Sequence, residues 1–419
     1  MKPGQPPGLT ILGKVPTPRS ADVGAASDER SMRRACAMGI DVAAATRSLS
    51  RSARCLREHR VSISNVSILV SRVTGGAASV ASADGVTAGA DKREGVLEIP
   101  GRVTLHHGGT LEGVRVGWQL TGPVTAPVVV ALGGISANRR VEAVERSGAE
   151  RTEAGWWSEV VGPGLALPTD QLRVLSFDYL GGSGETSGPR EGGAFPAVSS
   201  YDQAELLRRL LDHLGIRALC AIVGASYGGM VALAFGERYP DRVAQLVVIS
   251  AADRSHPMST AWRSVQRRIV RFGLDAGQAE RGLELARALA MSTYRSPEEF
   301  AARFTGSPKN TPQGFIFPVE EYLLARGRDY AQRYQPDAFL TLSESIDLHR
   351  IDASRVFVPV TAIAVREDQL VPVADMRAMC ARLPQARLHE ISSVYGHDAF
   401  LKEAGQLKPI FASLTESTP

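Results

Sequence analysis

Cysteine is scarce in this sequence: there are four residues among 419, far apart and without a C-x-x-C pair. That spacing argues against a disulfide framework or a zinc site and favours a reducing compartment such as the cytoplasm. Because no run of eighteen apolar residues occurs, we expect no membrane-spanning helix. The formal net charge of +4 is small for this length, so nothing in it indicates a nucleic-acid partner.

Hydrophobic residues make up 44% of the chain, enough for one large α/β domain or two ordinary ones. Residues 1–95 differ from the rest because they are poor in aromatics and rich in Ala, Ser, Gly and Arg. We expect a disordered basic extension there, with an Arg- and Ser-rich targeting peptide as the alternative. The folded domain is expected to occupy residues 96–419.

Short, β-branched apolar runs recur through the second part of the chain. They occupy residues 127–132, 172–177, 219–225, 243–250, 358–365 and 386–392. Near-continuous apolar runs are typical of strands that are covered on both faces. Helical patterns such as those at 201–215 and 228–240 separate several of the runs. This alternation predicts an α/β fold with a mostly parallel, doubly covered sheet.

The alternation stops between residues 253 and 350, where four consecutive segments have helical patterns. Because this stretch lies between one predicted strand and the next, we expect a helical insertion over one edge of the sheet. Ligand sites in such sheets lie at the carboxyl ends of the strands, so the insertion is expected to act as a lid and substrate wall.

A Gly-Ala-Ser-Tyr-Gly pentad at 224–228 stands between a predicted strand and a predicted helix. The G-x-S-x-G pattern alone is common by chance, but this context is the one that a nucleophile elbow requires. The tight turn needs glycines and presents Ser226 at a helix N-terminus, where backbone amides point at a developing anion. The alternative is an ordinary tight turn in which the serine only caps the helix.

A serine nucleophile needs a base, and the elbow fold supplies an acid and a histidine later in the chain. Asp368 follows the predicted strand at 358–365, with Glu367 as the second choice. His397 is the one histidine in the loop after the last predicted strand. We therefore predict a Ser226–Asp368–His397 triad. The oxyanion hole is expected to use the backbone N–H groups of Tyr227 and Gly133, with Gly134 as the second choice for the latter.

Several stretches of the sequence resemble one family of acyl-transferring enzymes. The segments "GASYGGMVALAFGERYPDRV", "ARALAMSTYRSPEEFAARF", "PDAFLTLSESID" and "YGHDAFL" look like those of the homoserine O-acyltransferases of the α/β-hydrolase fold. Members of that family catalyse the first committed step of methionine biosynthesis. The resemblance runs from about residue 97 to the end and does not cover the first 95 residues.

The resemblance implies a cytoplasmic homodimer and a ping-pong acyltransferase whose co-substrate is acyl-CoA, with no further cofactor and no metal. Ser226 would take the acyl group and pass it to the hydroxyl of L-homoserine, with His397 as the base in both steps. Family substrate residues match Arg287 and Tyr294 for the carboxylate of the amino acid, and Asp398 for its ammonium group. Without the resemblance, Arg287 would be interpreted as a solvated helix charge.

The acyl donor is left open by the resemblance. Gly133 stands where the acetyltransferases often have a threonine, and Arg139 and Arg140 follow shortly after. Arg263 lies at the start of the insertion, near the expected position of the acyl group. A succinyl group ends in a carboxylate that is costly to bury unpaired, so these arginines favour succinyl-CoA over acetyl-CoA. The alternative is that the arginines face solvent or the phosphates of CoA.

Rival functions use the same features differently. Homoserine O-acetyltransferase and serine O-acyltransferase differ only in donor or acceptor. An esterase or other hydrolase of the same fold would use the triad with water, but it has no use for residues that bind a zwitterion. A non-enzymatic scaffold would not need an intact Ser226, Asp368 and His397.

Overall fold

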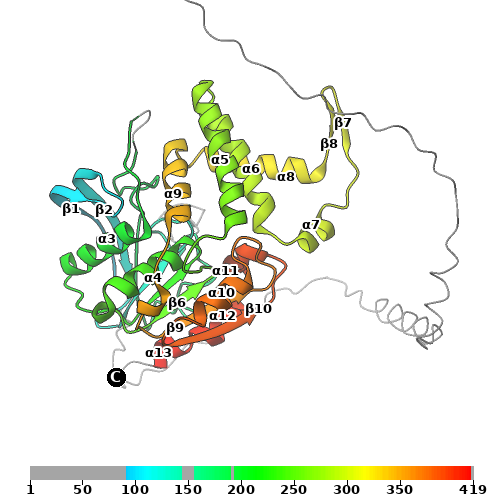
Figure 1. Cartoon of the computed structure of the whole chain (residues 1–419). Helices are drawn as coiled ribbons and strands as arrows, with labels where there is room; N and C mark the ends of the chain where they lie inside the picture. Colours follow the sequence, from blue (N-terminus) through cyan, green and yellow to red (C-terminus); the bar gives the residue numbers. More distant parts are fainter. Residues whose placement is uncertain (1–90, 144–154, 190–192, 417–419) are drawn as a thin grey trace, which may run out of the picture. The chain divides into compact units, whose positions relative to one another are not determined.

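The computed structural model describes residues 91–143, 155–189 and 193–416 (Figure 1). The extension predicted for residues 1–95 lies outside this part, except for its last few residues. These belong to strand β1 (Lys92–Thr104), in which Lys92 pairs with Thr121 of strand β2 (Thr110–Thr121). The domain therefore begins before residue 96, because backbone pairing with β2 extends into the charged start of β1.

Within the described residues, eight strands form one sheet in the order β1-β2-β4-β3-β5-β6-β9-β10. The six that follow β2 are parallel and match the six predicted runs: β3 (Val128–Leu132), β4 (Arg173–Phe177), β5 (Ala221–Ala225), β6 (Leu246–Ile249), β9 (Val360–Val365) and β10 (Ala386–Ile391). Their carboxyl ends therefore lie at one edge of the sheet, and the loops that follow them meet there.

The central strands β3, β4, β5, β6 and β9 are buried on both faces, as the continuous apolar runs predicted, whereas β10 is an edge strand with exposed and half-buried side chains. In β5, Ile222 packs into one hydrophobic core, whereas Ala221 and Val223 pack into a second core on the other side. The first core includes helices α3 (Ser200–His213) and α4 (Tyr227–Arg238), and the second includes α12 (Ala404–Phe411). Smaller helices, α10 (Val373–Cys380), α11 (Ala399–Lys402) and α13 (Ser413–Glu416), complete the C-terminal part.

Strands β1 and β2 were not predicted from the sequence. They are antiparallel to each other, and β2 is antiparallel to β4. β1 is an edge strand, and most of its side chains are exposed or half-buried. The apolar run that marks a doubly covered strand is therefore missing from it.

The insertion between β6 and β9 consists mainly of helices: α5 (Pro257–Asp275), α6 (Ala279–Tyr294), α7 (Pro297–Arg303), α8 (Pro318–Ala331) and α9 (Pro336–Leu348). It also contains a small hairpin, β7 (Lys309–Thr311) and β8 (Gly314–Ile316), where we expected helix alone. Gly314 has φ of 115°, a conformation that favours glycine and turns the chain back on itself.

The insertion helices lie beside the edge of the sheet at which the parallel strands end (Figure 1). α6 and α8 approach each other closely at Gly327, where an added Cβ would come within 2.4 Å of the Glu284 carbonyl oxygen. Among the described residues, no helix is both long enough and apolar enough to cross a membrane.

Candidate active site

Ser226 occupies a strained turn between β5 and α4. Its backbone has φ of 55° and ψ of −121°, which is rare for a residue other than glycine. The flanking glycines are required because a Cβ on Gly224 would lie 2.2 Å from the Gly228 oxygen. One on Gly228 would lie 2.3 Å from the Leu132 oxygen. The turn thus has the geometry of a nucleophile elbow, and it presents the Ser226 hydroxyl at the N-terminus of α4.

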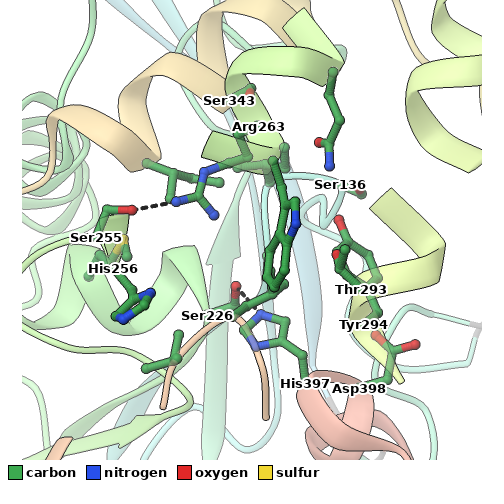
Figure 2. A pocket seen from close by; sticks show the side chains of 18 of the residues that line it. Ser136, Ser226, Ser255, His256, Arg263, Thr293, Tyr294, Ser343, His397 and Asp398 are labelled. Atoms are coloured by element: carbon green, nitrogen blue, oxygen red, sulfur yellow. Dashed lines mark hydrogen bonds between the residues drawn. The ribbon is translucent and has the colours of Figure 1, made fainter. Parts of the chain in front are cut away.

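The three residues predicted as a triad meet above the carboxyl ends of β5, β9 and β10. His397 Nε2 lies 2.8 Å from Ser226 Oγ (Figure 2), and His397 Nδ1 lies 2.7 Å from Asp368 Oδ2. The other carboxylate oxygen of Asp368 accepts hydrogen bonds from the N–H groups of Leu370 and Val371, at 2.8 and 3.0 Å. These bonds fix the carboxylate in the orientation that holds the imidazole.

Glu367, the second choice for the acid, points elsewhere. Its carboxylate accepts hydrogen bonds from the Ser392 hydroxyl and from the Ser393 N–H, the latter at 2.8 Å. Glu367 therefore ties the loop after β9 to the loop after β10, and Asp368 alone reaches His397.

His397 is buried, and burial by itself would lower the pKa of its imidazole. The carboxylate of Asp368 outweighs this effect through its charge and hydrogen bond, so the pKa of His397 is raised above the ordinary 6.5. An imidazole with a raised pKa is a stronger base toward the Ser226 hydroxyl. The arrangement is therefore one in which Ser226 can act as a nucleophile, His397 as its base and Asp368 as the group that orients the base.

Two segments surround the position where an oxyanion would form. The N–H of Tyr227 begins α4 and has no partner inside the helix, as for any first turn. On the opposite side, Gly134 lines the cavity and its Cα faces Ser226, because an added Cβ would lie 3.9 Å from Ser226 Oγ. Gly133, our first choice, lies deeper: its carbonyl accepts hydrogen bonds from Tyr179 and Gly228. The geometry thus favours Gly134 over Gly133 as the second donor.

The three residues matched to amino-acid binding line the same cavity. Arg287 donates to the Tyr294 hydroxyl at 3.1 Å, and its guanidinium lies over the Tyr330 ring at 4.5 Å. Burial would lower the pKa of Arg287, but Tyr294, Tyr330 and Asp398 raise it. Arg287 is therefore a permanent cation that two aromatic rings hold in place.

Asp398 has a partner that the sequence did not indicate. Its carboxylate lies 3.3 Å from Arg295 Nε, and burial raises its pKa above the usual value even so. Arg295 directly follows Tyr294 and also packs over the Tyr395 ring at 5.1 Å. In the sequence, only its position next to Tyr294 could have suggested that Arg295 belongs to the site. Its contact with Asp398 arises from the fold.

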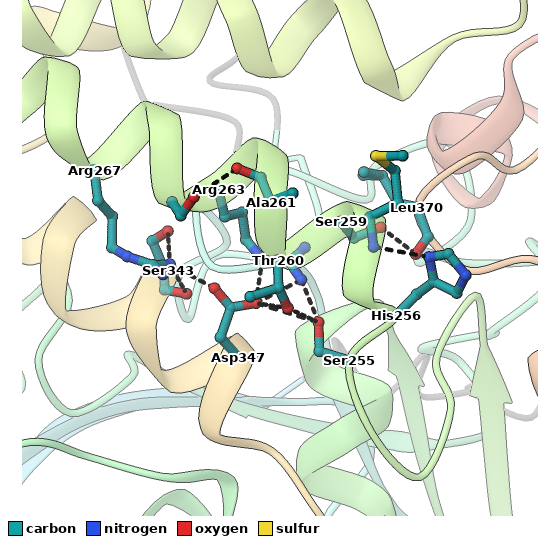
Figure 3. Close-up of polar contacts among 12 residues, drawn as sticks. Ser255, His256, Ser259, Thr260, Ala261, Arg263, Arg267, Ser343, Asp347 and Leu370 are labelled. Atoms are coloured by element: carbon teal, nitrogen blue, oxygen red, sulfur yellow. Dashed lines mark hydrogen bonds and ion pairs between the residues drawn. The ribbon is translucent and has the colours of Figure 1, made fainter. Parts of the chain in front are cut away.

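Arg263 lines the cavity, but its guanidinium is already engaged (Figure 3). Its Nε donates to Asp347 at 2.8 Å, and it also contacts the Ser255 hydroxyl. Arg267 meets the same carboxylate at 2.6 Å, so two guanidinium groups share one charge of opposite sign. Although burial favours the neutral form, the two arginines hold the pKa of Asp347 below its usual value.

Arg139, the alternative cation in the glycine loop, is not part of the cavity wall. It pairs with Asp178 at 2.6 Å and with Glu185 at 2.9 Å, and it is largely buried. These contacts anchor the glycine loop to the segment that follows β4. The prediction that Arg139 bears on the donor is therefore wrong.

The cavity that contains these groups has a volume of about 190 Å³. Apolar side chains form much of its wall, among them Met230, Trp262, Phe339 and Leu370. Figure 2 shows Arg263 on one side of Ser226, with Tyr294 and Asp398 on the other. Within the described part of the chain, no cluster of three or more His, Cys, Asp or Glu residues is arranged to hold a metal ion.

Comparisons with known sequences place the chain in one family. The model of the α/β-hydrolase fold family matches residues 127–404. A homoserine O-succinyltransferase of Xanthomonas campestris pv. campestris is 41% identical, with 77% of this chain and 83% of the relative covered. A homoserine O-acetyltransferase of Clavibacter michiganensis is 32% identical, with 72% and 87% covered. A serine O-succinyltransferase of Litchfieldella anticariensis is 30% identical, with 75% and 96% covered.

Solved structures extend the comparison to the fold. A homoserine O-acetyltransferase from Bacillus anthracis superposes with a TM-score of 0.70 at 20% identity, covering 79% of this chain and 99% of that one. Esterase E22 superposes with a TM-score of 0.69 at 18% identity, covering 78% and 100%. At these identities the likeness concerns the fold alone, which transferases and esterases share.

Proposed function

This chain belongs to the homoserine O-acyltransferases of the α/β-hydrolase fold, and we propose that it transfers a succinyl group from succinyl-CoA to the hydroxyl of L-homoserine. The reaction is a step of methionine biosynthesis. The observation that carries the proposal is one cavity in which a Ser226–His397–Asp368 triad lies between Arg263 on one side and Arg287 with Asp398 on the other.

In the first half-reaction Ser226 Oγ attacks the thioester carbonyl carbon while His397 Nε2 takes the hydroxyl proton. The carbonyl oxygen becomes an oxyanion that the N–H groups of Tyr227 and Gly134 stabilise. When the tetrahedral intermediate collapses, the carbon–sulfur bond breaks, and His397 returns the proton to the leaving thiolate of CoA. The acyl group remains as an ester on Ser226.

In the second half-reaction the hydroxyl of homoserine takes the place of the CoA thiol. His397 removes its proton, the alkoxide attacks the acyl-serine carbonyl, and Ser226 leaves with the proton that His397 carries. The half-buried pair of Arg287 and Tyr294 binds the amino-acid carboxylate, and Asp398 binds its ammonium group. These contacts position the hydroxyl near the ester and give it an advantage over water.

The proposal for the donor rests on the charge near Arg263. Arg263 and Arg267 both pair with the single carboxylate of Asp347, so this group of three side chains has a net charge of about +1. Arg263 is the member that faces the cavity. The distal carboxylate of a succinyl group would complete the pairing, whereas an acetyl group has no charge to offer. The 41% identity to a homoserine O-succinyltransferase supports the same choice.

Replacing Arg263 with leucine is expected to lower kcat/KM for succinyl-CoA by roughly ten- to thousand-fold, because the distal carboxylate loses a partly buried partner. The rate with acetyl-CoA is expected to hold or rise. Arg267→Leu is the matched control, since it removes a guanidinium from the same Asp347 but not from the cavity wall. An equal loss with both donors in Arg263→Leu would assign Arg263 to packing and contradict the proposal.

Steady-state rates with two donors and two acceptors test the function itself. Succinyl-CoA and acetyl-CoA are each combined with L-homoserine and L-serine, and release of CoA is compared with formation of the O-acyl amino acid. Preference for succinyl-CoA and homoserine is the expected result. Preference for acetyl-CoA, or for serine, would replace the donor or the acceptor in the proposal. Release of CoA without an acylated amino acid would mean hydrolysis.

We also propose a homodimer formed through the insertion. On α5 the apolar residues Met258, Val265 and Phe272 recur every seven residues and are 52%, 49% and 75% exposed. A stripe of this kind on a helix fits the same stripe of a second copy.

Phe272→Glu is expected to give monomers in light scattering. Phe357→Glu, at a 61% exposed phenylalanine outside the stripe, is the control, and an unchanged mass for Phe272→Glu would refute this interface.

The proposed chemistry needs neither metal nor cofactor, since acyl-CoA enters as a co-substrate and leaves as CoA. It also needs no nucleic-acid or membrane partner. We propose a cytoplasmic location, supported by the unpaired state of both described cysteines, Cys220 and Cys380. Tagged protein followed by cell fractionation tests the location.

A further inference from the structure

A second cavity, of about 440 Å³, lies in the helical insertion. Residues of α6, α7 and α8, and residues that directly follow α6 and α8, form its wall; Figure 1 shows where these helices lie. Its lining is strongly basic. The described residues around it include one carboxylate, that of Asp329, and the arginines Arg287, Arg295, Arg303, Arg326 and Arg333. We call this cavity the arginine cleft.

The arginines of the cleft outnumber their acidic partners. The ion pairs among them are Arg295–Glu299 (3.3 Å), Arg303–Glu299 (3.2 Å), Arg326–Asp329 (2.8 Å) and Arg295–Asp398 (3.3 Å). Arg333 donates instead to the backbone oxygen of Asp329, at 2.9 Å. Within the described chain, five guanidinium groups therefore meet three carboxylates. Converging cations repel one another, so the cleft is a place where a multivalent anion is stabilised.

The arginine cleft adjoins the catalytic cavity. Arg287 lines both, with its guanidinium between the rings of Tyr294 and Tyr330 at 5.0 and 4.5 Å. Tyr330 lines the cleft and accepts a hydrogen bond at 3.4 Å from Ser136, which lines the catalytic cavity. The two cavities therefore share part of their wall, and a long ligand that leaves Ser226 past Arg287 would reach the cleft with its anionic end.

We propose that the arginine cleft binds the phosphate groups of the acyl-CoA donor. This inference rests on the proposed function, because it takes CoA as the carrier of the acyl group. The CoA molecule carries a diphosphate and a 3′-phosphate on its adenosine, far from the thioester. Guanidinium groups bind phosphates through paired, charge-assisted hydrogen bonds, and a concave basic surface draws anions toward it.

Arg326→Gln and Arg333→Gln test the site, because both side chains are exposed and neither lines the catalytic cavity. Each variant is expected to raise KM for acyl-CoA roughly five- to thirty-fold, in proportion to one lost charge-assisted contact, with little change in kcat. KM for the matching S-acylpantetheine, which has the same thioester but no phosphates, is expected to stay unchanged. Arg271→Gln, at an exposed arginine of α5, is the control and should change neither value.

Direct binding separates this inference from the proposed function. Adenosine 3′,5′-bisphosphate, which carries phosphates but no thioester, is titrated calorimetrically into the wild type and the two variants. Weaker binding in both variants supports the cleft as a phosphate site, whichever acyl group the enzyme transfers. Binding that is absent in the wild type, or equal in all three proteins, overturns the inference, as do equal KM changes for acyl-CoA and acylpantetheine. Absence of wild-type turnover with any acyl-CoA would instead overturn the proposed function.

Discussion

The Ser226→Ala protein is expected to fold normally, to form no acyl-enzyme and to lose roughly 10⁶ in kcat. Loss of a triad nucleophile has an effect of about this size in a well-studied serine protease. Ser226 is the only group at the elbow whose oxygen lies within hydrogen-bond distance of His397, at 2.8 Å, among the residues that the structure describes. Without the Ser226 hydroxyl no group attacks the thioester, and the oxyanion donors alone accelerate acyl transfer only slightly compared with the complete triad.

Mass spectrometry after mixing with acyl-CoA measures this loss directly. The wild type should gain the mass of one acyl group on the peptide that contains Ser226, and the variant should gain none. Ser136→Ala is the matched control: it removes another hydroxyl from the same cavity but not the nucleophile. Its acyl-enzyme should form at a rate close to that of the wild type. An adduct on the Ser226→Ala protein would show that the nucleophile lies elsewhere.

Asp368→Asn is expected to lower kcat by roughly 10⁴ while leaving the site assembled. The amide keeps the shape of the carboxylate, but its N–H₂ group can donate to His397 Nδ1 and so select the wrong tautomer. The same exchange in a serine protease has an effect of about this size. Glu367→Gln is the control, since Glu367 holds the Ser393 N–H at 2.8 Å and does not reach His397. A similar loss in both variants would contradict the assignment of the acid.

The pH dependence of kcat/KM shows whether Asp368 only orients the His397 ring or also raises the pKa of His397 through its charge. His397 must be neutral to accept a proton, so activity falls as the pH drops through its pKa. Because Asp368 raises that pKa above 6.5, the acid limb of the wild-type profile should have its midpoint above 6.5. In Asp368→Asn the larger of the two raising charges is gone, while Asp398 and burial remain, so the limb should move to lower pH. A limb that stays in place would mean that Asp368 does not set the basicity of His397.

The parallel strand order explains why the triad was predictable. Each of the three residues follows an apolar run, and the carboxyl ends of parallel strands lie at one edge of the sheet. Once the runs at 219–225, 358–365 and 386–392 are assigned as strands, the loops after them must converge. The distances of 2.8 and 2.7 Å around His397 agree with that reasoning.

Elements without such a pattern were missed. β1 carries charged, exposed side chains because it forms the edge of the sheet, and β2 is buried mainly over its second half, residues 114–121. Their pairing is visible only when the two segments lie side by side. The hairpin of β7 and β8 is only three residues long on each side and depends on the turn at Gly314. Because helical patterns lie on both sides of it in the sequence, we interpreted the whole stretch as helix.

The sequence alone therefore determined the α/β fold, the elbow at Ser226 and the order of the triad, since these depend on periodicity and chain order. The tertiary structure decided what the remaining charges do. Arg263 and Asp347 are 84 residues apart, Arg139 and Asp178 are 39 apart, and Arg295 and Asp398 are 103 apart. Ion pairs between distant segments leave no local pattern, because their geometry exists only after those segments have packed against one another.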